Sequence, residues 1–502
     1  MPIPVNVSPF NCYESLDRIV AGGFRRLSEE DQIFLRSIGI FLKKDRHFMV
    51  RLRLRAGNLS RQQAQKIGEL AKQYGDDYLD FTTRQEIELR YIELANLTVL
   101  LRELESVGIS TSQTGGNSIR TITSSSFNAL GKAHIIDVFP LIEEIEQEIL
   151  NEAYWMENLP SKFNLSLLGT SINDCNIYGN DCAFVVAQQH EIIGFKLYLG
   201  GAVGRQAEDS GLFVPPQKVV KTFWAVITCF GHLAKKGERL HQLLERVGME
   251  YFLFSLQSEI TLESGGGSKV LAVEEYRIDE TGLLPMDEEL SMVHLSVPSG
   301  LFSGSCLMEL AGEATKHNAK IRISLEQSIY LLVDPEEVAS LKSSLIYRIY
   351  EPYHHLYYNH QIACTSAETV AFSVLPNKTD AIALSNFLQQ KVPIPNAKVR
   401  LYWSSSPKGY GLHDIADIGF VGISQEGSKE RRLNLYLGGK VTHEAKVGRL
   451  IFEGITLEEA KVYVKRIMEL YRDQRLGDES FESFDSRVLG SLSVEEIRKI
   501  LT

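Results

Sequence analysis

Two groups of side chains in this sequence are of types that could bind a metal ion or carry thiol chemistry. One is the segment "YHHLYYNH" at 353–360, whose histidines lack a cysteine or carboxylate at ligand spacing, so we interpret it as polar surface or the edge of a binding site. The other is a set of six cysteines, spaced so widely that they favour a reducing compartment over a disulfide framework. They are Cys12, Cys175, Cys182, Cys229, Cys306 and Cys364.

A third segment is unusual because it carries so little chemistry. "WSSSPKGYG" at 403–411 has the composition of a rigid turn after a strand, yet none of its side chains is an obvious nucleophile, acid or base. The glycine-rich "GGGSKV" at 265–270 lacks the spacing of a phosphate-binding loop. Neither segment by itself identifies an activity.

The composition sets broad limits on the function. A chain of 502 residues is too long for one hydrophobic core, so we expect at least two domains. The formal net charge of −11 argues against binding to nucleic acid or to an anionic membrane surface. We see no signal peptide and no apolar run long enough to cross a membrane, and we therefore expect a cytoplasmic protein.

An internal repeat organises the chain. "LYLGG" occurs at 197–201 and again at 435–439, which is an offset of 238 residues (435 minus 197). "NDCAFVV" at 180–186 pairs with "ADIGFVG" at 416–422, and "TTRQEIELRYI" at 82–92 pairs with "SLEQSIYLLVD" at 324–334. Matches in one order at nearly one offset indicate a duplicated half. Two such halves usually pack about a pseudo-twofold axis, where a ligand touches both.

Each half is predicted to be a mixed α/β unit. In the first half, an alternating strand ("FMVRLRLRA") precedes a helix that begins after the N-cap Ser60 and ends at Gly75. A second strand ("DYLDFTTRQEIELRYI") and a second helix ("ANLTVLLRELESVG") follow. This β-α-β-α order predicts half of a ferredoxin-like layer, followed by a longer α/β segment.

The ordered motifs resemble those of a known family, the assimilatory sulfite and nitrite reductases that use sirohaem and a 4Fe–4S cluster. The resemblance covers residues of roughly 20 to 475 and rests on the whole ordered set. In the first half the set is "FMVRLRLRAG", "LDFTTRQEIEL", "TGGNSIRTIT", "NLPSKFNLSLLG", "NDCAFV", "LYLGG" and "LLERVGMEYF". In the second half it is "HLSVPSG", "IRISLEQSIYLL", "IACTSAETVAF", "RLYWSSSPKGYG", "IADIGFVG" and "LYLGGKV".

The resemblance implies the duplicated sulfite/nitrite-reductase fold, an α/β (α+β) architecture of two pseudo-twofold-related halves. Each half has a ferredoxin-like half-domain and an α/β lobe, and the lobe of the first half binds the sirohaem. The boundaries that we expect are an N-terminal arm at 1–45, half-domain 1 at 46–110, lobe 1 at 111–261, a linker at 262–289, half-domain 2 at 290–350, lobe 2 at 351–475 and a C-terminal tail at 476–502.

In that family, basic and polar side chains of the first half surround the anion that binds the sirohaem iron. The resemblance carries this catalytic role onto Arg51 of "FMVR", Arg120 of "SIRT", and Lys162 and Asn164 of "SKFN". Lysine followed two residues later by asparagine resembles the nitrite-reducing members. Clustered cations suit the chemistry, because reduction of an oxyanion consumes protons and releases water. The alternative is that Arg51 and its neighbour Arg53 are solvated or bind phosphate.

By the same resemblance, a further set of side chains contacts the carboxylates of the macrocycle. These expected cofactor-binding residues are Thr82, Thr83, Arg84, Gln85, Arg239 and His241.

The resemblance fails at the cluster. The family has a second cysteine six residues after the first and two more in a "WTGCPNSCG" motif. Here Cys364 is kept, but Val370, Ser406 and Tyr410 stand at the other three positions. A cubane needs four thiolates, or three with another donor, so we expect no 4Fe–4S cluster. The turn at 403–411 is then the inherited shell of a cluster site.

Two residues leave alternatives open. Tyr410 stands where the family's bridging cysteine faces the iron, so its phenolate can be an axial haem ligand, and the alternative is a buried tyrosine that fills the volume of the lost cluster. Cys175 and Cys182 lie on the first-half counterpart of this segment, and they either contribute to a metal site or are buried small hydrophobic residues, which we prefer.

These observations predict a sirohaem-binding or haem-binding oxidoreductase with an intact anion pocket, which is not an ordinary six-electron reductase. Its partners would be a small anion or carboxylate substrate and an electron donor or sibling subunit. The alternative is a non-catalytic family member that acts as a partner subunit, or as a carrier or sensor of sirohaem or its precursors. A relation to precorrin-3B synthase is disfavoured, because that enzyme also uses a cluster.

Overall fold

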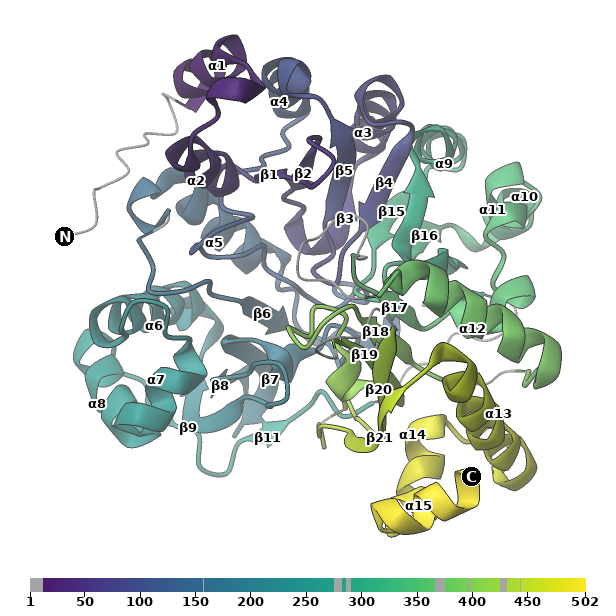
Figure 1. Cartoon of the computed structure of the whole chain (residues 1–502). Coiled ribbons are helices and arrows are strands. Elements are labelled where there is room, and N and C mark those ends of the chain that lie inside the picture. Colours follow the sequence, from purple (N-terminus) through teal and green to yellow (C-terminus); the bar gives the residue numbers. More distant parts are fainter. Residues whose placement is uncertain are drawn as a thin grey trace. The chain divides into compact units, whose positions relative to one another are not determined.

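The computed structural model describes residues 12–156, 158–274, 282–285, 290–365, 375–395, 398–424, 431–442 and 444–502 (Figure 1). The chain forms two compact units. The first comprises residues 1–80, 84–275 and 302–312, and the second comprises 81–83, 276–301 and 313–502. The domain boundaries expected from the sequence remain a prediction.

The first unit begins with a layer that matches the predicted ferredoxin-like half-domain. Its sheet has the strand order β1-β2-β5-β4, followed by β14 beside β4. Helix α3 begins after Ser60, whose hydroxyl accepts a hydrogen bond from the Gln63 amide while the Gln63 side chain accepts one from the Ser60 amide. It ends at Tyr74, before Gly75, so the predicted helix is confirmed. The elements are α1 (Cys12–Gly22), α2 (Glu29–Ser37), β1 (Ile40–Leu42), β2 (Phe48–Leu52), β3 (Asn58–Leu59), α3 (Arg61–Tyr74), β4 (Tyr78–Phe81), β5 (Ile87–Ile92), α4 (Leu97–Glu105), β14 (Leu301–Ser303) and α9 (Gly304–Lys316).

The prediction of one long second strand at 77–92 is wrong in one respect. The structure divides it into β4 and β5, with a turn at 82–86 between them. Gln85 in this turn has a φ of 58°, which an extended strand cannot accommodate. The layer is therefore β-α-β-β-α, and the turn brings Arg84 to the end of the sheet.

The second layer of the first unit is a sheet with helices packed beside it, drawn in teal in Figure 1. Its strand order is β10-β9-β8-β7, and both β6 and β11 pair with β7. Two short strands, β10 and β11, come from the segment predicted to be a linker. The elements are α5 (Phe139–Asn151), β6 (Leu165–Leu168), β7 (Cys182–Gln189), β8 (Ile192–Leu199), β9 (Glu208–Val214), α6 (Val219–Leu233), α7 (Leu240–Val247), α8 (Met249–Glu259), β10 (Glu263–Ser264) and β11 (Lys269–Val270).

The second unit repeats both layers. One sheet contains the order β12-β13-β16-β15, and the other has the order β17-β18-β19-β20-β21. The predicted C-terminal helix is present as α15. The elements are β12 (Leu283–Pro285), β13 (Ser291–Leu295), β15 (Lys320–Ile323), β16 (Ile329–Val333), α10 (Val338–Lys342), α11 (Leu345–Ile349), β17 (Gln361–Ala363), α12 (Asn377–Lys391), β18 (Leu401–Ser404), β19 (Ile418–Ile423), β20 (Arg432–Leu437), β21 (Arg449–Ile455), α13 (Leu457–Gln474), α14 (Phe481–Phe484) and α15 (Val494–Leu501).

Corresponding backbone details confirm the duplication. Strands β6 and β7 are parallel, with Leu165 opposite Cys182, and β18 and β19 are parallel in the same way. Gln85 and its counterpart Gln327 both have a left-handed φ, of 58° and 59°. Gln85 Oε1 accepts a hydrogen bond from the backbone amide of Ser124, and Gln327 Oε1 accepts one from the backbone amide of Ala363. The two copies therefore share turn geometry as well as strand order.

The helices give no indication of a membrane span. Among the described residues, none of the helices combines the length and the apolar character needed to cross a bilayer.

Candidate functional site

A short parallel pairing in the first unit places three of the four predicted anion-pocket residues on one side of the backbone. Ile119 pairs with Phe163, and both side chains are fully buried. Because side chains alternate along extended backbone, Arg120, Lys162 and Asn164 point away from that core. Phe163 packs against Phe230 of α6, with ring centroids 5.5 Å apart, and this fixes the segment.

Arg51 on β2 is the fourth predicted residue, and the structure brings it to Arg120. The Arg51 guanidinium donates to Glu88 Oε1 from Nη2 at 2.7 Å and to the Thr114 carbonyl from Nη1 at 2.9 Å. Arg120 donates to that same Thr114 carbonyl and, at 2.8 Å, to the Gly116 carbonyl. One backbone oxygen thus joins the two guanidinium groups.

Neighbouring Arg53 has a different role. It is buried and lies 3.0 Å from a carboxylate oxygen of Glu146, and it donates to the Ile119 carbonyl. The alternative that Arg53 is solvated is therefore wrong.

The fully buried carboxylate of Asp181 anchors the other side of this group. Arg239 donates to it through Nε at 3.1 Å and Nη2 at 2.7 Å, and the backbone N–H of Asn164 donates to Asp181 Oδ2 at 2.8 Å. Arg84, from the turn after β4, donates to the carbonyls of Thr121 and Leu165. These contacts bring two predicted cofactor-binding arginines, Arg84 and Arg239, into the neighbourhood of Lys162.

Burial and neighbouring cations lower the pKa values of two basic residues in this group, Lys162 and Arg84. Burial, followed by the charges of Arg239 and Arg120, lowers the pKa of Lys162 from 10.5 to about 7, against the opposing effect of Asp181. Burial also lowers the pKa of Arg84 to about 10. Lys162 is thus poised to gain or lose a proton near neutral pH.

The charge of Arg51 is compensated, in contrast to that of Lys162. Burial acts to lower the pKa of Arg51, but Glu88 and Glu86 outweigh it and the pKa is raised. Arg51 therefore keeps its charge and has a fixed orientation, while Lys162 is the group whose charge can change.

The remaining predicted cofactor-binding residues are His241 and Gln85 in the first unit and Thr82 and Thr83 in the second. His241 is on the first turn of α7, beside Arg239, and burial together with Arg239 lowers its pKa. The Gln85 side chain is buried and accepts from the Ser124 amide at 3.1 Å, so it has a structural bond of its own. Thr82 and Thr83 are half-buried, and Thr83 Oγ1 donates to the Tyr410 carbonyl at 3.1 Å within the second unit.

Asp181 is the functional residue that the sequence reasoning missed. The signal was present, since "NDCAFV" and "ADIGFV" align Asp181 with Asp417. Asp417 accepts from the Arg400 amide and guanidinium just as Asp181 binds the Asn164 amide and Arg239. An aspartate directly before β7 and before its counterpart β19 predicts a buried carboxylate that binds the neighbouring backbone and an arginine.

The counterpart position in the second unit is internally neutralised. Arg400 aligns with Asn164, and its guanidinium donates to Asp417 at 2.6 Å and to Glu482 at 2.5 Å. All three side chains are buried. Two carboxylates therefore compensate this cation, whereas three arginines of the first unit act to lower the pKa of Lys162.

Cys364, predicted to be the one retained cluster cysteine, follows β17 in the second unit. Its Sγ accepts a hydrogen bond from the Ser405 amide at 3.1 Å and lies 3.6 Å from Asn377 Nδ2. Burial is the main cause of its raised pKa, so the thiol is protonated at neutral pH. Polar protein groups surround this sulfur. Val370, predicted to replace the second cysteine, lies outside the described residues.

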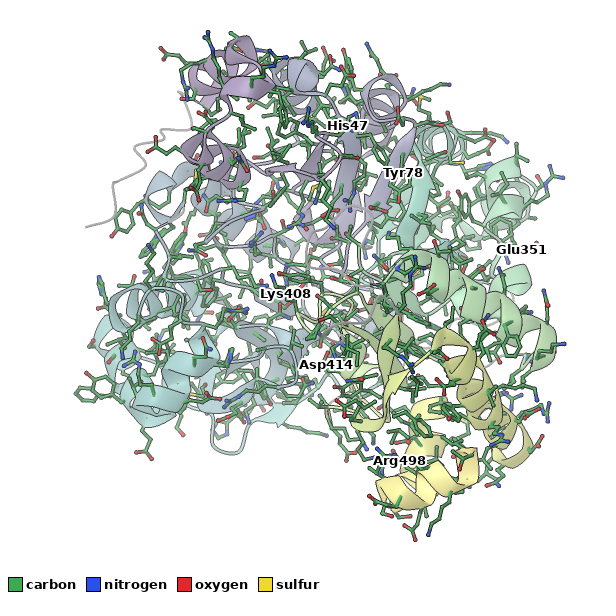
Figure 2. The ribbon with its side chains drawn as sticks, in the orientation of Figure 1. His47, Tyr78, Glu351, Lys408, Asp414 and Arg498 are labelled. Carbon is green, nitrogen blue, oxygen red and sulfur yellow. The ribbon has the colours of Figure 1, made fainter. Side chains whose placement is uncertain are left out.

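The turn at 404–411 is held by its own hydrogen bonds. Ser404 Oγ accepts from the Gly411 amide at 3.0 Å and lies 3.0 Å from His413 Nδ1. A Cβ atom on Gly411 would lie 1.8 Å from the Trp403 carbonyl oxygen, so only glycine fits there. Figure 2 labels Lys408 at the exposed part of this turn and Asp414 just after it.

The two residues of this turn that are predicted to replace cluster cysteines, Ser406 and Tyr410, differ in exposure. Ser406 is buried, whereas the Tyr410 side chain is 44% exposed. The alternative of a buried tyrosine that fills the volume of the lost cluster is therefore wrong, and ligation of a haem by Tyr410 remains a prediction.

The other cysteines and the histidine segment were the remaining candidates for a metal site. Cys175 and Cys182 are fully buried, which supports the reading of them as small hydrophobic residues. No group of three or more histidine, cysteine or acidic side chains in the described parts of the chain could hold a metal ion. His360 is buried with Nδ1 2.6 Å from Glu326, so its predicted place at a polar surface is wrong. The side chains of His354 and His355 lie outside the described residues.

Comparison with protein-family models gives two matches. The model described as "Nitrite and sulphite reductase 4Fe-4S domain" matches residues 115–262 and 363–481, which together exceed half of the chain. The model described as "Nitrite/Sulfite reductase ferredoxin-like half domain" matches residues 41–107. The first model covers Arg120, Lys162, Asn164 and Cys364, and the second covers Arg51.

Similar proteins extend over most of the chain. A protein of Synechococcus elongatus named ferredoxin–nitrite reductase is 27% identical, over 86% of this chain and 88% of its own length. The chloroplastic ferredoxin–nitrite reductase of Arabidopsis thaliana is 25% identical, over 88% and 80%. The solved structure of the NirA protein of Mycobacterium tuberculosis aligns with a TM-score of 0.86 at 22% identity, covering 98% of this chain and 96% of that one. That structure confirms the predicted fold.

Proposed function

The chain belongs to the nitrite and sulphite reductase family, and from this premise we propose that it is an oxidoreductase that binds sirohaem or a related haem and acts on a small anion. We further propose that Arg51, Arg120, Lys162 and Asn164 bind that anion and that the protein lacks the family's 4Fe–4S cluster. The observation that carries the proposal is the proximity of Arg239, Arg120 and Arg84 to Lys162, whose pKa they act to lower.

The anion pocket is supported by the electrostatics of the first unit. Arg239, Arg120 and Arg84 all act to lower the pKa of Lys162, and the carboxylate of Asp181 acts to raise it. A bound anion would add negative charge beside Lys162 and stabilise its protonated amine. Arg51 and Arg120, both fixed by the Thr114 carbonyl, would orient the anion, and Lys162 Nζ would hold a proton close to it.

The residues present fit a macrocycle with acidic side chains. Arg84 and Arg239 lie in the same positive neighbourhood as Lys162, and guanidinium groups bind carboxylates in two-point geometry. We propose that they hold the macrocycle with His241 and Gln85 of the same unit, and the expected contacts of Thr82 and Thr83 remain a prediction. When bound, the haem iron would coordinate the anion and transfer electrons to it.

The residues present do not fit a cysteine-held cluster. The sequence has Ser406 and Tyr410 at two cluster positions and Val370 at a third. Burial raises the pKa of the Cys364 thiol, and its Sγ accepts a hydrogen bond from the Ser405 amide. One thiol cannot hold a cubane that needs three or four protein donors. We therefore propose that electrons reach the haem from an external one-electron donor, and the names of the relatives suggest a ferredoxin.

The cysteine loss also favours a second candidate function. A family member without the cluster could be non-catalytic and act as a partner subunit, or as a carrier or sensor of sirohaem or its precursors. This candidate shares the macrocycle and the anion pocket with the first, so only turnover distinguishes them.

The test combines composition, spectrum and turnover on one preparation made with sirohaem synthesis enabled. We expect a haem absorption band and bound iron without acid-labile sulfide, a spectral change with nitrite, and electron consumption from reduced ferredoxin. Arg120→Gln should weaken the nitrite response, whereas Lys221→Gln, at an exposed position on α6, should leave it unchanged. Acid-labile sulfide would refute the loss of the cluster. Absence of any chromophore would refute haem binding, and a chromophore without turnover would select the non-catalytic candidate.

A further inference from the structure

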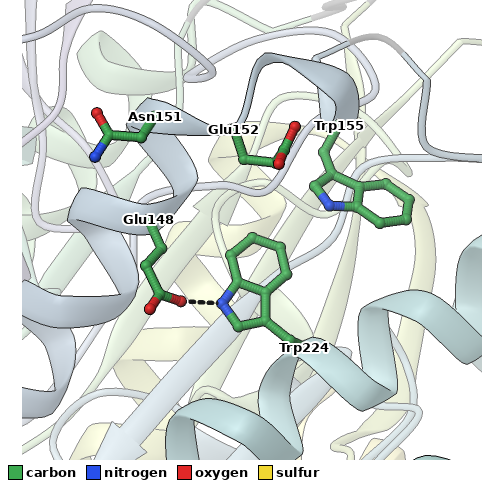
Figure 3. A pocket seen from close by; sticks show the side chains of 5 residues that line it. All are labelled: Glu148, Asn151, Glu152, Trp155 and Trp224. Carbon is green, nitrogen blue, oxygen red and sulfur yellow. Dashed lines mark hydrogen bonds between the residues drawn. The ribbon is translucent and has the colours of Figure 1, made fainter.

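A cavity in the first unit lies at the C-terminal end of α5 and is lined by two tryptophans and two glutamates. Its volume is about 390 Å³, and its lining consists of Glu148, Asn151, Glu152, Trp155 and Trp224 (Figure 3). This volume is in the range of small-ligand pockets, roughly 300–1,000 Å³. Neither the anion pocket nor the haem-binding residues proposed above include any of these side chains.

Both indole rings are held in place by the surrounding protein. Trp224 on α6 donates its Nε1 hydrogen to Glu148 Oε2, which fixes the plane of the ring. Trp155 packs edge-to-face against Tyr154, with centroids 4.9 Å apart, and it covers Gly231 so closely that a Cβ atom there would lie 3.0 Å from the ring. The pocket therefore presents two oriented aromatic surfaces.

The electrostatic environment of this cavity favours a cation. Glu148, Asn151 and Glu152 lie at the C-terminal end of a 13-residue helix, where the helix dipole contributes negative potential. A basic residue usually offsets this potential, but the last turn of α5 has none. The Glu152 carboxylate accepts a hydrogen bond from the Tyr154 backbone amide at 3.0 Å, and the Glu148 carboxylate accepts one from the Trp224 indole. Both donors are uncharged, so these hydrogen bonds orient the two carboxylates and leave their negative charge in place.

We propose that this cavity binds a small organic cation of the methylated-ammonium class. Such a cation offers an apolar body that contacts the faces of Trp155 and Trp224 and a diffuse charge that the ring quadrupoles attract. Glu148 and Glu152 add attraction of longer range. A metal ion would not use the indole faces, and an anion would be repelled by both carboxylates.

The distribution of tryptophan makes the test direct. The chain has three tryptophans, and two of them line the cavity. The third, Trp403, is fully buried in the second unit and stacked on Phe420. Protein labelled with 5-fluorotryptophan should therefore show three ¹⁹F resonances, which Trp155→Phe and Trp224→Phe would assign.

The probe is the tetramethylammonium ion, with neopentane-like 2,2-dimethylpropanol as a neutral compound of similar shape. We expect tetramethylammonium to shift the resonances of Trp155 and Trp224 in a saturable manner and to leave that of Trp403 unchanged. The neutral compound should bind at least about fivefold more weakly. Equal binding of the two compounds, or no shift at the two cavity resonances, would overturn the proposal.

Variants separate the contribution of charge from that of shape. Trp224→Leu should weaken tetramethylammonium binding by about two- to fivefold, the size of one exposed cation–aromatic contact. Glu148→Gln with Glu152→Gln keeps the acceptor atoms for Trp224 and Tyr154 but removes both charges, and it should weaken binding further. Phe254→Ala is the matched control, because Phe254 is an aromatic residue of the same unit, 75% exposed on α8. If Phe254→Ala weakened binding as much as Trp224→Leu, the proposed cavity would be the wrong site.

Discussion

Protonation of Lys162 should make anion binding depend on pH in the neutral range. The pKa of this amine is about 7 rather than 10.5, because it is buried and lies near Arg239 and Arg120. Its charged form should bind an anion well and its neutral form poorly. The perturbation is therefore a pH titration of nitrite affinity, since nitrite stays fully ionised over the range.

The size of the effect follows from the pKa. With a value of about 7, the charged fraction of Lys162 falls from roughly nine-tenths at about pH 6 to roughly one-hundredth at about pH 9. Nitrite affinity should fall by up to about 90-fold over this interval if only the charged form binds. Binding at about pH 8 to 9 should also take up nearly one proton, because the bound anion raises the pKa of Lys162.

The same shift affects stability with a defined sign. The folded-state pKa of Lys162 lies below its unfolded value, so between about pH 7 and pH 10.5 the unfolded chain binds more protons. The contribution of Lys162 to the free energy of unfolding therefore rises as the pH increases through this window.

The assay is isothermal titration calorimetry with nitrite in buffers of different ionisation enthalpy, which reports affinity and proton uptake together. Two variants separate charge from titration. Lys162→Arg keeps a cation that does not titrate in this range, so its affinity should remain high and independent of pH. Lys162→Gln should bind weakly at every pH. If the wild-type protein bound nitrite equally at about pH 6 and about pH 9, with no proton uptake, the assigned role of Lys162 would be refuted.

Three further predictions concern the anchor, the turn and the tyrosine. Asp181→Asn should reduce the free energy of unfolding by about 3–5 kcal/mol in urea, because it leaves the Arg239 guanidinium without its buried carboxylate; a loss below about 1 kcal/mol would contradict this. Gly411→Ala should prevent stable folding or lower the melting temperature sharply, since its Cβ would meet the Trp403 carbonyl at 1.8 Å, whereas Gly312→Ala, with open space around the Cβ, should be tolerated or slightly stabilising. Tyr410→Phe should change the visible spectrum of the bound haem if the phenolate is an axial ligand, and an unchanged spectrum would remove Tyr410 from the ligand set.

Local features of this protein could be predicted from the sequence because they depend on nearby residues. Ser60 caps α3 through Gln63, only three positions away, so residue type and spacing were sufficient. The duplication was visible because both halves kept the motifs that form the same turns. The absence of cysteine at 406 and 410 is likewise a matter of residue identity, and its consequence for a cluster stays a prediction.

The properties that give the site its chemistry depend on contacts between distant parts of the chain. Asp181 accepts hydrogen bonds from the backbone N–H of Asn164, 17 residues away, and from the guanidinium of Arg239, 58 residues away. The pKa of Lys162 depends on burial and on cations from separate segments, and electrostatic energy follows distance in space rather than along the chain. The left-handed turn at Gln85 and the exposure of Tyr410 likewise depend on neighbours that only the fold supplies. The sequence therefore determined which groups were available, and the tertiary structure decided which of them share a charge environment.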